Sequence, residues 1–418
     1  MNRQYKNNNE TRRQFIKFLA ASPVLALGSS TALAQSDLLY RALDSITDLD
    51  AQLPRLVSDV KSVFELEKLA EHVLPPAHYG YVLQGSGGME TTRRNREALT
   101  GYAIQPRRLQ GIEKVDSTTE LFGQKLDYPL FLCPTNGHRA FHAQGEIATA
   151  KGARQANALQ MLSSLTTTPV EAVNEARGEP VWFQLYPTND EQVRRELVER
   201  AEAAGCPAIV VTVDDIGSRK SDTFARYSRL DKRDCTLCHQ RHEGISDFLR
   251  RKAMFQDYRT RPGFNISHES MDFDDIRRLR DNVKGKLLVK GIMHPADALR
   301  CAEAGVDGVL VSNHGGRVES GGMGTFDALP HVVDAVKGKI AILMDGGIRR
   351  GGDAFKALAM GADAVGMGRP YLWGLSTFGA DGVAHVMTMV AAELRQAMLQ
   401  AGVDSVQDLR PEMIRKLK

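Results

Sequence analysis

The chain has 418 residues, of which 42% are hydrophobic and 25% are charged, and its formal net charge is +3. This composition is typical of a folded globular protein and argues against a disordered chain or a bundle of membrane helices. Five basic residues and one acidic residue lie within residues 1–34, so the rest of the chain is nearly neutral. A nearly neutral body predicts no nucleic-acid partner.

Residues 1–34 have the features of a twin-arginine-type signal peptide. Arg12-Arg13 precedes a short apolar run, and Ala32-Leu33-Ala34 forms an A-x-A cleavage site. An N-terminal membrane anchor is the alternative, but the run is interrupted by Lys17 and Pro23 and is shorter than the roughly 20 residues that a span needs. We therefore expect an exported, periplasmic protein without a stable membrane span.

Residues 35–127 are predicted to form an N-terminal helical segment and a lead-in. Apolar residues recur at helical spacing between Leu53 and Leu66, which indicates an amphipathic helix within residues 37–84. Pro75-Pro76 and the glycine-rich run 85–88 are expected to interrupt the helical structure.

From about residue 128 to residue 418, short apolar runs alternate with amphipathic stretches of helix length. Continuous apolar strands separated by helices indicate a parallel sheet covered on both faces. Eight such units predict an α/β fold of the TIM (β/α)8 barrel type with an N-terminal helical segment, interrupted by a loop insertion at about 231–272. A doubly wound open sheet is the alternative. The runs are Pro129–Cys133, Gln160–Leu162, Val181–Leu185, Ala208–Val213, Lys286–Val289, Gly308–Val311, Ile340–Met344 and Ala364–Gly366.

Polar residues follow nearly every one of these runs, where a barrel places its chemistry. In V-S-N-H-G-G-R, Val311 to Arg317, an imidazole that titrates near neutral pH is followed three residues later by a guanidinium that can bind a carboxylate. This spacing indicates an acid–base group beside an anion site. The alternative is a loop His314 that caps its own turn.

The last two runs are followed by M-D-G-G-I-R-R-G and G-M-G-R-P. Barrels commonly bind phosphate at this place through backbone N–H groups. Gly346, Gly347 and Gly368 expose such groups, and Arg349 and Arg369 add positive charge, so we predict a phosphate site here.

Two further charged residues follow central runs. Asp214 could orient an imidazole and stabilise its charged form, although a helix N-cap is the alternative. Lys290 would point into the mouth of the barrel, where a buried cation requires a partner anion.

The motif Cys235-Thr236-Leu237-Cys238-His239 has the C-x-x-C-H spacing that attaches c-type haem. In an oxidising compartment the two cysteines can instead form a disulfide or help to bind a metal, and these three interpretations stay open. The other cysteines, Cys133, Cys206 and Cys301, fall in strand or helix patterns and are expected to be buried.

Taken together, and in chain order, L-V-K-G, S-N-H-G-G-R and D-G-G-I-R-R-G resemble the FMN-dependent 2-hydroxy-acid dehydrogenase and oxidase family. The resemblance runs from about Leu74 to the C-terminus. It implies FMN as cofactor, oxidation of a small, lactate-like L-2-hydroxy acid, and a homotetramer. A cytochrome, a quinone or oxygen would accept the electrons. No metal is implied at the active site.

The resemblance also implies roles for individual residues. His314 would be the base, supported by Asp214, and Lys290 would stabilise the reduced flavin. Substrate would be held by Tyr81, Tyr186, Arg219, His314 and Arg317. The flavin and its phosphate would contact Pro134, Thr135, Asn136, Ser163, Gln184, Thr212, Lys290, Ser312, Asp345, Gly346, Gly347, Arg349, Gly368 and Arg369.

The chain departs from the family pattern at Asn136, where a small Ala or Gly is usual near the reactive face of the flavin, and at Leu165, often Trp in glycolate oxidases. These departures leave the substrate open. Two other functions compete with the leading one. The chain could be a c-type haem electron-transfer protein on a barrel scaffold, or an FMN barrel that catalyses isomerisation without net redox change.

Overall fold

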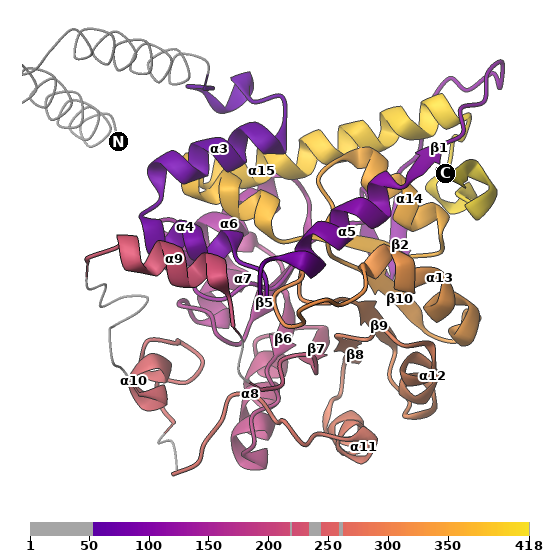
Figure 1. Cartoon of the computed structure of the whole chain (residues 1–418). Coiled ribbons are helices and arrows are strands. Elements are labelled where there is room, and N and C mark those ends of the chain that lie inside the picture. Colours follow the sequence, from indigo (N-terminus) through magenta and orange to yellow (C-terminus); the bar gives the residue numbers. More distant parts are fainter. Residues whose placement is uncertain (1–52, 218–219, 234–243, 259–261, 418) are drawn as a thin grey trace, which may run out of the picture. The chain divides into compact units, whose positions relative to one another are not determined.

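Eight parallel strands close into a barrel in the order β10-β11-β4-β5-β6-β7-β8-β9 (Figure 1). This arrangement confirms the predicted TIM barrel and excludes the open doubly wound sheet. Each predicted apolar run matches its strand to within one residue at either end, because these strands are buried on both faces. The strands are β4 (Leu130–Leu132), β5 (Leu159–Ser163), β6 (Trp182–Leu185), β7 (Ala208–Thr212), β8 (Lys286–Lys290), β9 (Gly308–Val311), β10 (Ala341–Met344) and β11 (Ala364–Met367).

The computed structural model describes residues 53–217, 220–233, 244–258 and 262–417. Residues 56–418 form one unit, and residues 1–55 belong to another. The predicted signal peptide, Arg219 and the C-x-x-C-H motif of Cys235, Cys238 and His239 therefore lie outside the described residues.

A helix follows each barrel strand and packs on the outside of the barrel (Figure 1). Local sequence sets several of the helix starts: the Asp190 carboxylate, for example, accepts hydrogen bonds from the N–H groups of Gln192 and Val193. The last helix is broken at Gly379, whose φ is +62°. The helices are α6 (Gly145–Gln155), α7 (Val170–Arg177), α8 (Glu191–Ala203), α11 (Phe273–Asn282), α12 (Pro295–Glu303), α13 (Thr325–Val336), α14 (Gly351–Ala359) and α15 (Arg369–Ala401).

A hairpin of β2 (Thr119–Leu121) and β3 (Gln124–Leu126) packs against the barrel core. Its Leu121 and Leu126 join the cluster of side chains inside the barrel, which includes Phe131 and Trp182. The Trp182 indole also donates to the Gln124 side chain across 3.2 Å. The barrel interior is therefore a packed apolar core.

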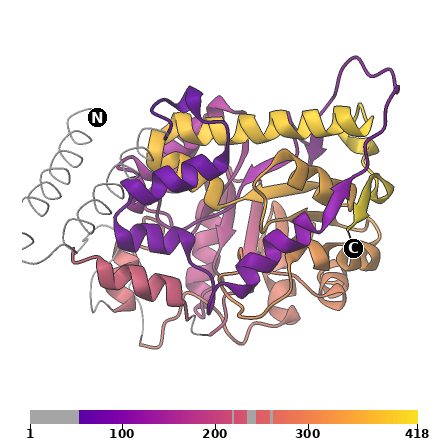
Figure 2. The same ribbon diagram turned by 45° about the horizontal axis from the view of Figure 1, so that its top comes forward.

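The N-terminal segment contains η2 (Val57–Asp59), α3 (Val63–Val73), α4 (Pro76–Leu83) and α5 (Glu90–Thr100). Apolar residues at helical spacing, Val63 and Leu66 among them, are the buried positions of α3, which runs beside α15 (Figures 1 and 2). As predicted, Pro75-Pro76 separates two helices, and residues 85–88 separate the next two.

The C-terminal end of the chain returns to this lead-in. There β12 (Ile414–Lys416) pairs antiparallel with β1 (Tyr102–Ile104). Single 3₁₀ turns complete the described elements: η3 (His138–Ala140), η4 (Val406–Asp408) and η5 (Pro411–Met413).

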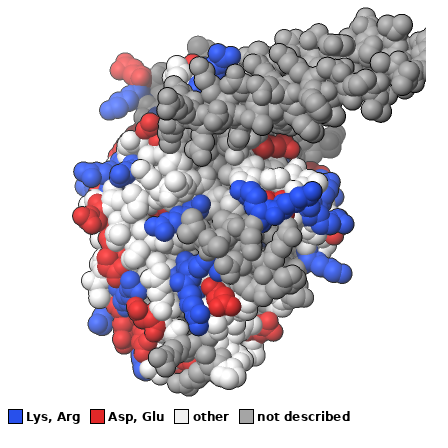
Figure 3. Space-filling view, turned by 90° about the vertical axis from the view of Figure 1, so that its left-hand side faces the viewer, with Lys and Arg blue, Asp and Glu red and all other residues white. Residues whose placement is uncertain are grey.

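The connection between β7 and α11 is longer than the others and carries α9 (Asp222–Leu230) and α10 (Ile245–Arg250). Helix α9 packs against α4. Figure 3 shows this side of the protein, where described side chains of both signs of charge lie on the surface. Among the described residues, we find no helix with the length and apolar character needed to cross a bilayer.

Candidate active site

A cavity of about 380 Å³ lies among residues that follow the barrel strands. This volume falls in the range of small-molecule sites, and the position is the one that barrel enzymes use. Most of the side chains predicted for the site line it together. They are Tyr81, Pro134, Thr135, Asn136, Tyr186, Lys290, His314, Arg317, Asp345, Gly346, Gly347, Arg349, Gly368 and Arg369.

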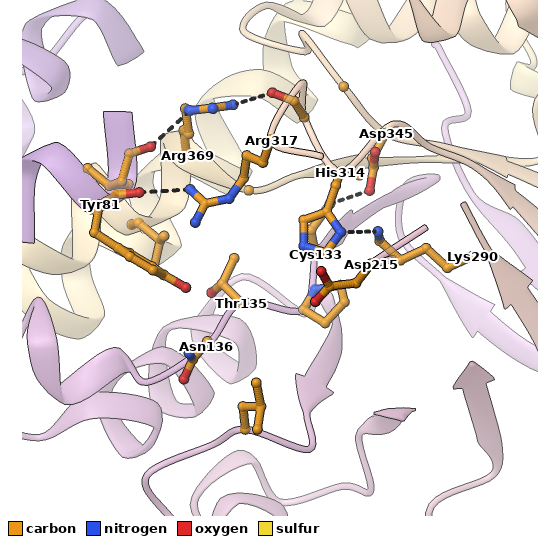
Figure 4. A pocket seen from close by; sticks show the side chains of 18 of the residues that line it. Tyr81, Cys133, Thr135, Asn136, Asp215, Lys290, His314, Arg317, Asp345 and Arg369 are labelled. Carbon is orange, nitrogen blue, oxygen red and sulfur yellow. Dashed lines mark hydrogen bonds between the residues drawn. The ribbon is translucent and has the colours of Figure 1, made fainter. Parts of the chain in front are cut away.

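His314, Asp214 and Lys290 form a connected group at this cavity (Figure 4 labels the first and last). The His314 Nδ1 atom lies 2.9 Å from Asp214 Oδ1, and the Lys290 ammonium lies 3.3 Å from the other oxygen. Only 3% of the Asp214 side chain and 4% of the Lys290 side chain are exposed, against 16% for His314. The imidazole therefore faces the cavity and the carboxylate supports it from behind.

The charges of this group favour an ionised carboxylate. Burial alone would raise the pKa of Asp214, but Lys290 and His314 hold that pKa well below its usual range. Because a carboxylate only accepts hydrogen bonds, the Nδ1–H of His314 donates to Asp214. In a neutral imidazole with this hydrogen bond, the lone pair is on Nε2, which lies 3.4 Å from the Tyr186 hydroxyl at the cavity. A basic nitrogen is thus presented to a ligand.

His314 has a left-handed backbone conformation with φ of +57°, which is strained for a residue with a side chain. Its N–H donates to the Ser312 hydroxyl. The preceding residue is held from outside the loop, since Asn313 and Asn95 of α5 exchange two amide hydrogen bonds of 2.8 Å. A Cβ on Gly316 would lie 2.4 Å from the Thr92 nitrogen, so only glycine permits this packing. The lead-in helix therefore holds the His314 loop in place.

Arg317 and Tyr81 lie together on another part of the cavity (Figure 4). The Arg317 guanidinium donates to the Tyr81 carbonyl oxygen and stacks 4.6 Å from the centre of its ring. Tyr186 stacks near His314, with ring centres 6.5 Å apart. A cation, two phenol groups and an imidazole therefore converge on one space. Arg219, predicted to act with them, lies outside the described residues.

Arg349 and Arg369 lie at the predicted phosphate site, after β10 and β11. Arg369 donates to three backbone carbonyls, of Val82, Gln84 and Gly315, and Arg349 stacks 4.9 Å from the Trp373 ring. Burial lowers the pKa of Arg349 to about 10, and burial with two neighbouring arginines lowers that of Arg369 to about 9. Neither forms an ion pair with a described residue. Two buried cations that form no ion pair with a described residue suit a bound dianion.

Several predicted residues lie beside the cavity without lining it. Ser163, Gln184, Thr212 and Ser312 are buried, and the Gln184 amide donates to the Thr212 hydroxyl across 2.8 Å. The Ser312 hydroxyl donates to Asp345, whose pKa is raised by burial. Cys133, Cys206 and Cys301 are free and buried, as expected. Cys133 also lines the cavity, 3.7 Å from Asp345.

A buried network beneath Thr135 was not predicted from the sequence. The Thr135 hydroxyl lies 2.6 Å from His138 Nε2 and 2.5 Å from the Tyr371 hydroxyl. The Glu146 carboxylate accepts hydrogen bonds from the Thr167 and Thr168 hydroxyls and from two backbone N–H groups. Burial opposes its ionisation, but His138 and these hydrogen bonds lower the pKa of Glu146 to about 2.

Two more residues at or beside the cavity were not predicted from the sequence. Asp215 lines the cavity beside the predicted Asp214. Lys252, in the segment that follows α10, reaches Asn136 with its ammonium group. The sequence offers a weak signal for Asp215, which belongs to an Asp-Asp pair after a strand, and no signal for Lys252.

Comparison with known proteins places this site in a family. The sequence profile described as FMN-dependent dehydrogenase matches residues 70–416. An L-lactate oxidase of Lysinibacillus sphaericus is 38% identical over 353 residues, covering 83% of this chain and 90% of the relative. The L-lactate dehydrogenase of Alcaligenes faecalis is 34% identical over 374 residues, covering 85% of this chain and 98% of the relative.

A solved structure agrees with this result. A crystal structure of mandelate oxidase superimposes with a TM-score of 0.75 at 33% identity, covering 85% of this chain and 98% of that one. With the profile match and the close relatives, it shows that the chain belongs to the FMN-dependent 2-hydroxy-acid oxidase and dehydrogenase family, whose members are oxidoreductases acting on CH–OH groups.

Proposed function

We propose that the protein oxidises a small, lactate-like L-2-hydroxy acid to the 2-keto acid, with His314 as the base. The observation that carries the proposal is the His314–Asp214–Lys290 group, which shares one cavity with Arg317 and two tyrosines. The names of the relatives, which include L-lactate oxidase and L-lactate dehydrogenase, support a substrate of this size. The family supports a redox reaction over isomerisation.

The residues at the cavity fit FMN, the cofactor of the family. Arg349 and Arg369 form the cationic end that suits a phosphate, and Gly346, Gly347 and Gly368 line the same cavity, where backbone N–H groups can donate to a phosphate. Lys290 supplies a buried cation in the same cavity, suited to an electron-rich ring. When bound, FMN takes up the two electrons that leave the substrate.

The chain's own residues would bind, orient and deprotonate the substrate. Arg317 binds the carboxylate, and the Tyr81 and Tyr186 hydroxyls add hydrogen bonds. His314 Nε2 accepts a proton from the substrate, because Nδ1 is already engaged by Asp214. The Asp214 carboxylate then stabilises the imidazolium. Lys290 offsets negative charge that develops in the cavity.

The sequence and the resemblance support proposals for location, electron acceptor and assembly. We propose export by the twin-arginine-type signal of residues 1–34 and assembly as a homo-oligomer, a tetramer by resemblance. A cytochrome, a quinone or oxygen accepts the electrons. Covalent haem at Cys235, Cys238 and His239 would favour a cytochrome-like route, and a disulfide would leave the acceptor open.

An anaerobic titration of the purified holoprotein tests the proposal. L-Lactate, glycolate, L-mandelate and D-lactate are added in turn while the visible flavin absorbance is followed. Bleaching by an L-2-hydroxy acid, but not by D-lactate, is expected. A flavin that none of these acids reduces would contradict the proposal. Readmitting oxygen, cytochrome c or a soluble quinone then identifies the acceptor, and a Soret band that stays with the denatured chain would identify haem.

A further inference from the structure

The long connection after β7 brings a buried lysine to the edge of the cavity. Lys252 is only 2% exposed, and its Nζ donates to the Asn136 Oδ1 atom across 2.8 Å. The same ammonium lies 4.6 Å from the centre of the Phe248 ring. The Ala253 N–H donates to the Thr166 carbonyl across 3.0 Å, which anchors this segment beside β5. Lys252 is therefore held in a defined position behind the cavity wall.

This contact fixes the orientation of the Asn136 amide. An ammonium group can only donate, so the side-chain oxygen of Asn136 must face Lys252 and the NH₂ group must face away. Asn136 lines the cavity (Figure 4), and its Nδ2 has no hydrogen-bond partner among the described residues. Two N–H donors are thus available to a ligand.

Apolar side chains also line this cavity, and a donor placed among them is selective. Leu165, Phe248 and Ile266 line the same cavity, and Phe248 flanks Lys252 together with Asn136. A donor among apolar side chains discriminates strongly, because a ligand without an acceptor leaves it unpaired. Asn136 stands where the resemblance predicts Ala or Gly, residues that have no such donor.

We propose that Asn136, positioned by Lys252, selects 2-hydroxy acids that carry an acceptor oxygen on the carbon next to the reacting one. This inference rests on the proposed function and names its substrate class. Arg317 and His314 act on the carboxylate and the reacting hydroxyl, which every 2-hydroxy acid has. The Asn136 amide instead contacts the part of the molecule that differs between acids.

L-Glycerate and L-lactate test this inference because they differ by one hydroxyl on that carbon. The ratio of kcat/KM for L-glycerate to kcat/KM for L-lactate is measured in the holoenzyme. We expect the ratio to fall about tenfold in Asn136→Asp, which keeps the size of the side chain but has no N–H donor, and in Asn136→Ala. Lys252→Met should lower the ratio in the same direction, because the amide is free to turn, and Lys252→Arg should restore it.

The control is Lys232→Met, which makes the same change at an exposed lysine of the same connection and should leave the ratio unchanged. Ratios within twofold of the wild-type value in both Asn136 variants would overturn the inference while leaving the proposed function intact. If no 2-hydroxy acid reduces the wild-type flavin, the inference and the proposed function both fail. A fall in the ratio for Asn136→Asp with no change for Lys252→Met would overturn the positioning role of Lys252.

Discussion

The two ends of the cavity differ in whether their buried cations are paired with a carboxylate. At the His314 end, the Lys290 ammonium and the imidazole share one carboxylate, Asp214, within 3.3 Å. At the other end, Arg349 and Arg369 contact backbone carbonyls and an aromatic ring, and form no ion pair with described residues. Burial raises the pKa of Glu67, the carboxyl group that acts on both arginines, which weakens it as a counterion.

This difference suggests that one end of the cavity is suited to proton transfer and the other to binding the cofactor phosphate. A cation and an anion that are already paired keep their geometry before a ligand arrives, which suits proton transfer. Two cations without a paired carboxylate are stabilised most when an anion binds, which suits the retention of a phosphate. Substitutions at the first end should change rates, and substitutions at the second should change cofactor affinity.

Removing the carboxylate should have the largest effect. In Asp214→Asn the imidazole loses its charge partner and the preferred proton position on Nδ1, so we expect flavin reduction to slow by roughly 10²–10⁴-fold. Flavin should remain bound. Stopped-flow absorbance under anaerobic conditions measures the rate, with Asp334→Asn on the exposed face of α13 as control. A change of less than twofold would remove Asp214 from the mechanism.

Glu146 extends the comparison, because it is a buried anion stabilised by His138 together with neutral hydroxyl and N–H groups. Its pKa falls from the usual 4.5 to about 2 on folding, so its stabilisation is complete above about pH 5 and is lost as the pH falls toward 2. Glu146→Gln should lower the free energy of unfolding at pH 7 by about 3 kcal/mol.

Denaturant titrations at pH 7 and pH 4 measure this effect. The difference between wild type and Glu146→Gln should be smaller at the lower pH. Glu175→Gln, an exposed residue of α7, is the matched control. Equal stability of wild type and Glu146→Gln at pH 7 would show that the hydrogen bonds to Glu146 contribute nothing net.

Substitution of an arginine at the predicted phosphate site should have a smaller effect, and only on the binding of FMN. Arg349→Ala should weaken FMN binding about 10- to 100-fold, the range for a lost hydrogen bond to a charged group. Riboflavin, which has no phosphate, should bind the variant and the wild type equally. Quenching of flavin fluorescence on titration into the deflavinated protein measures both. Arg350→Ala, whose partner is Glu393, is the control. An equal loss for both flavins would place Arg349 elsewhere than at the phosphate.

The barrel and most of the cavity could be predicted from the sequence for physical reasons. Parallel strands buried on both faces are continuous apolar runs, as the interior positions of β7 and β9 show. Strand ends then bring residues distant in sequence to one place, which is how His314 and Asp214 come within hydrogen-bond distance.

Contacts made by the long connection after β7 could not be predicted. Lys252 belongs to a basic stretch that in sequence suggests a solvated surface, yet it is buried and contacts Asn136, 116 positions earlier. No periodicity encodes such a contact, because it depends on the path of an irregular segment. The same holds for His138 and Thr135, whose pairing requires a 3₁₀ turn with no strong sequence signal.

Chemical rescue of His314→Ala tests the central claim most directly. The variant should keep its flavin, and the rate of anaerobic flavin reduction by the best L-2-hydroxy acid should fall roughly 10²–10⁴-fold. Added imidazole should restore part of that rate, increasing with its unprotonated fraction. His331→Ala, an exposed histidine of α13, should behave like wild type. Reduction of His314→Ala at the wild-type rate without imidazole would contradict His314 as the base.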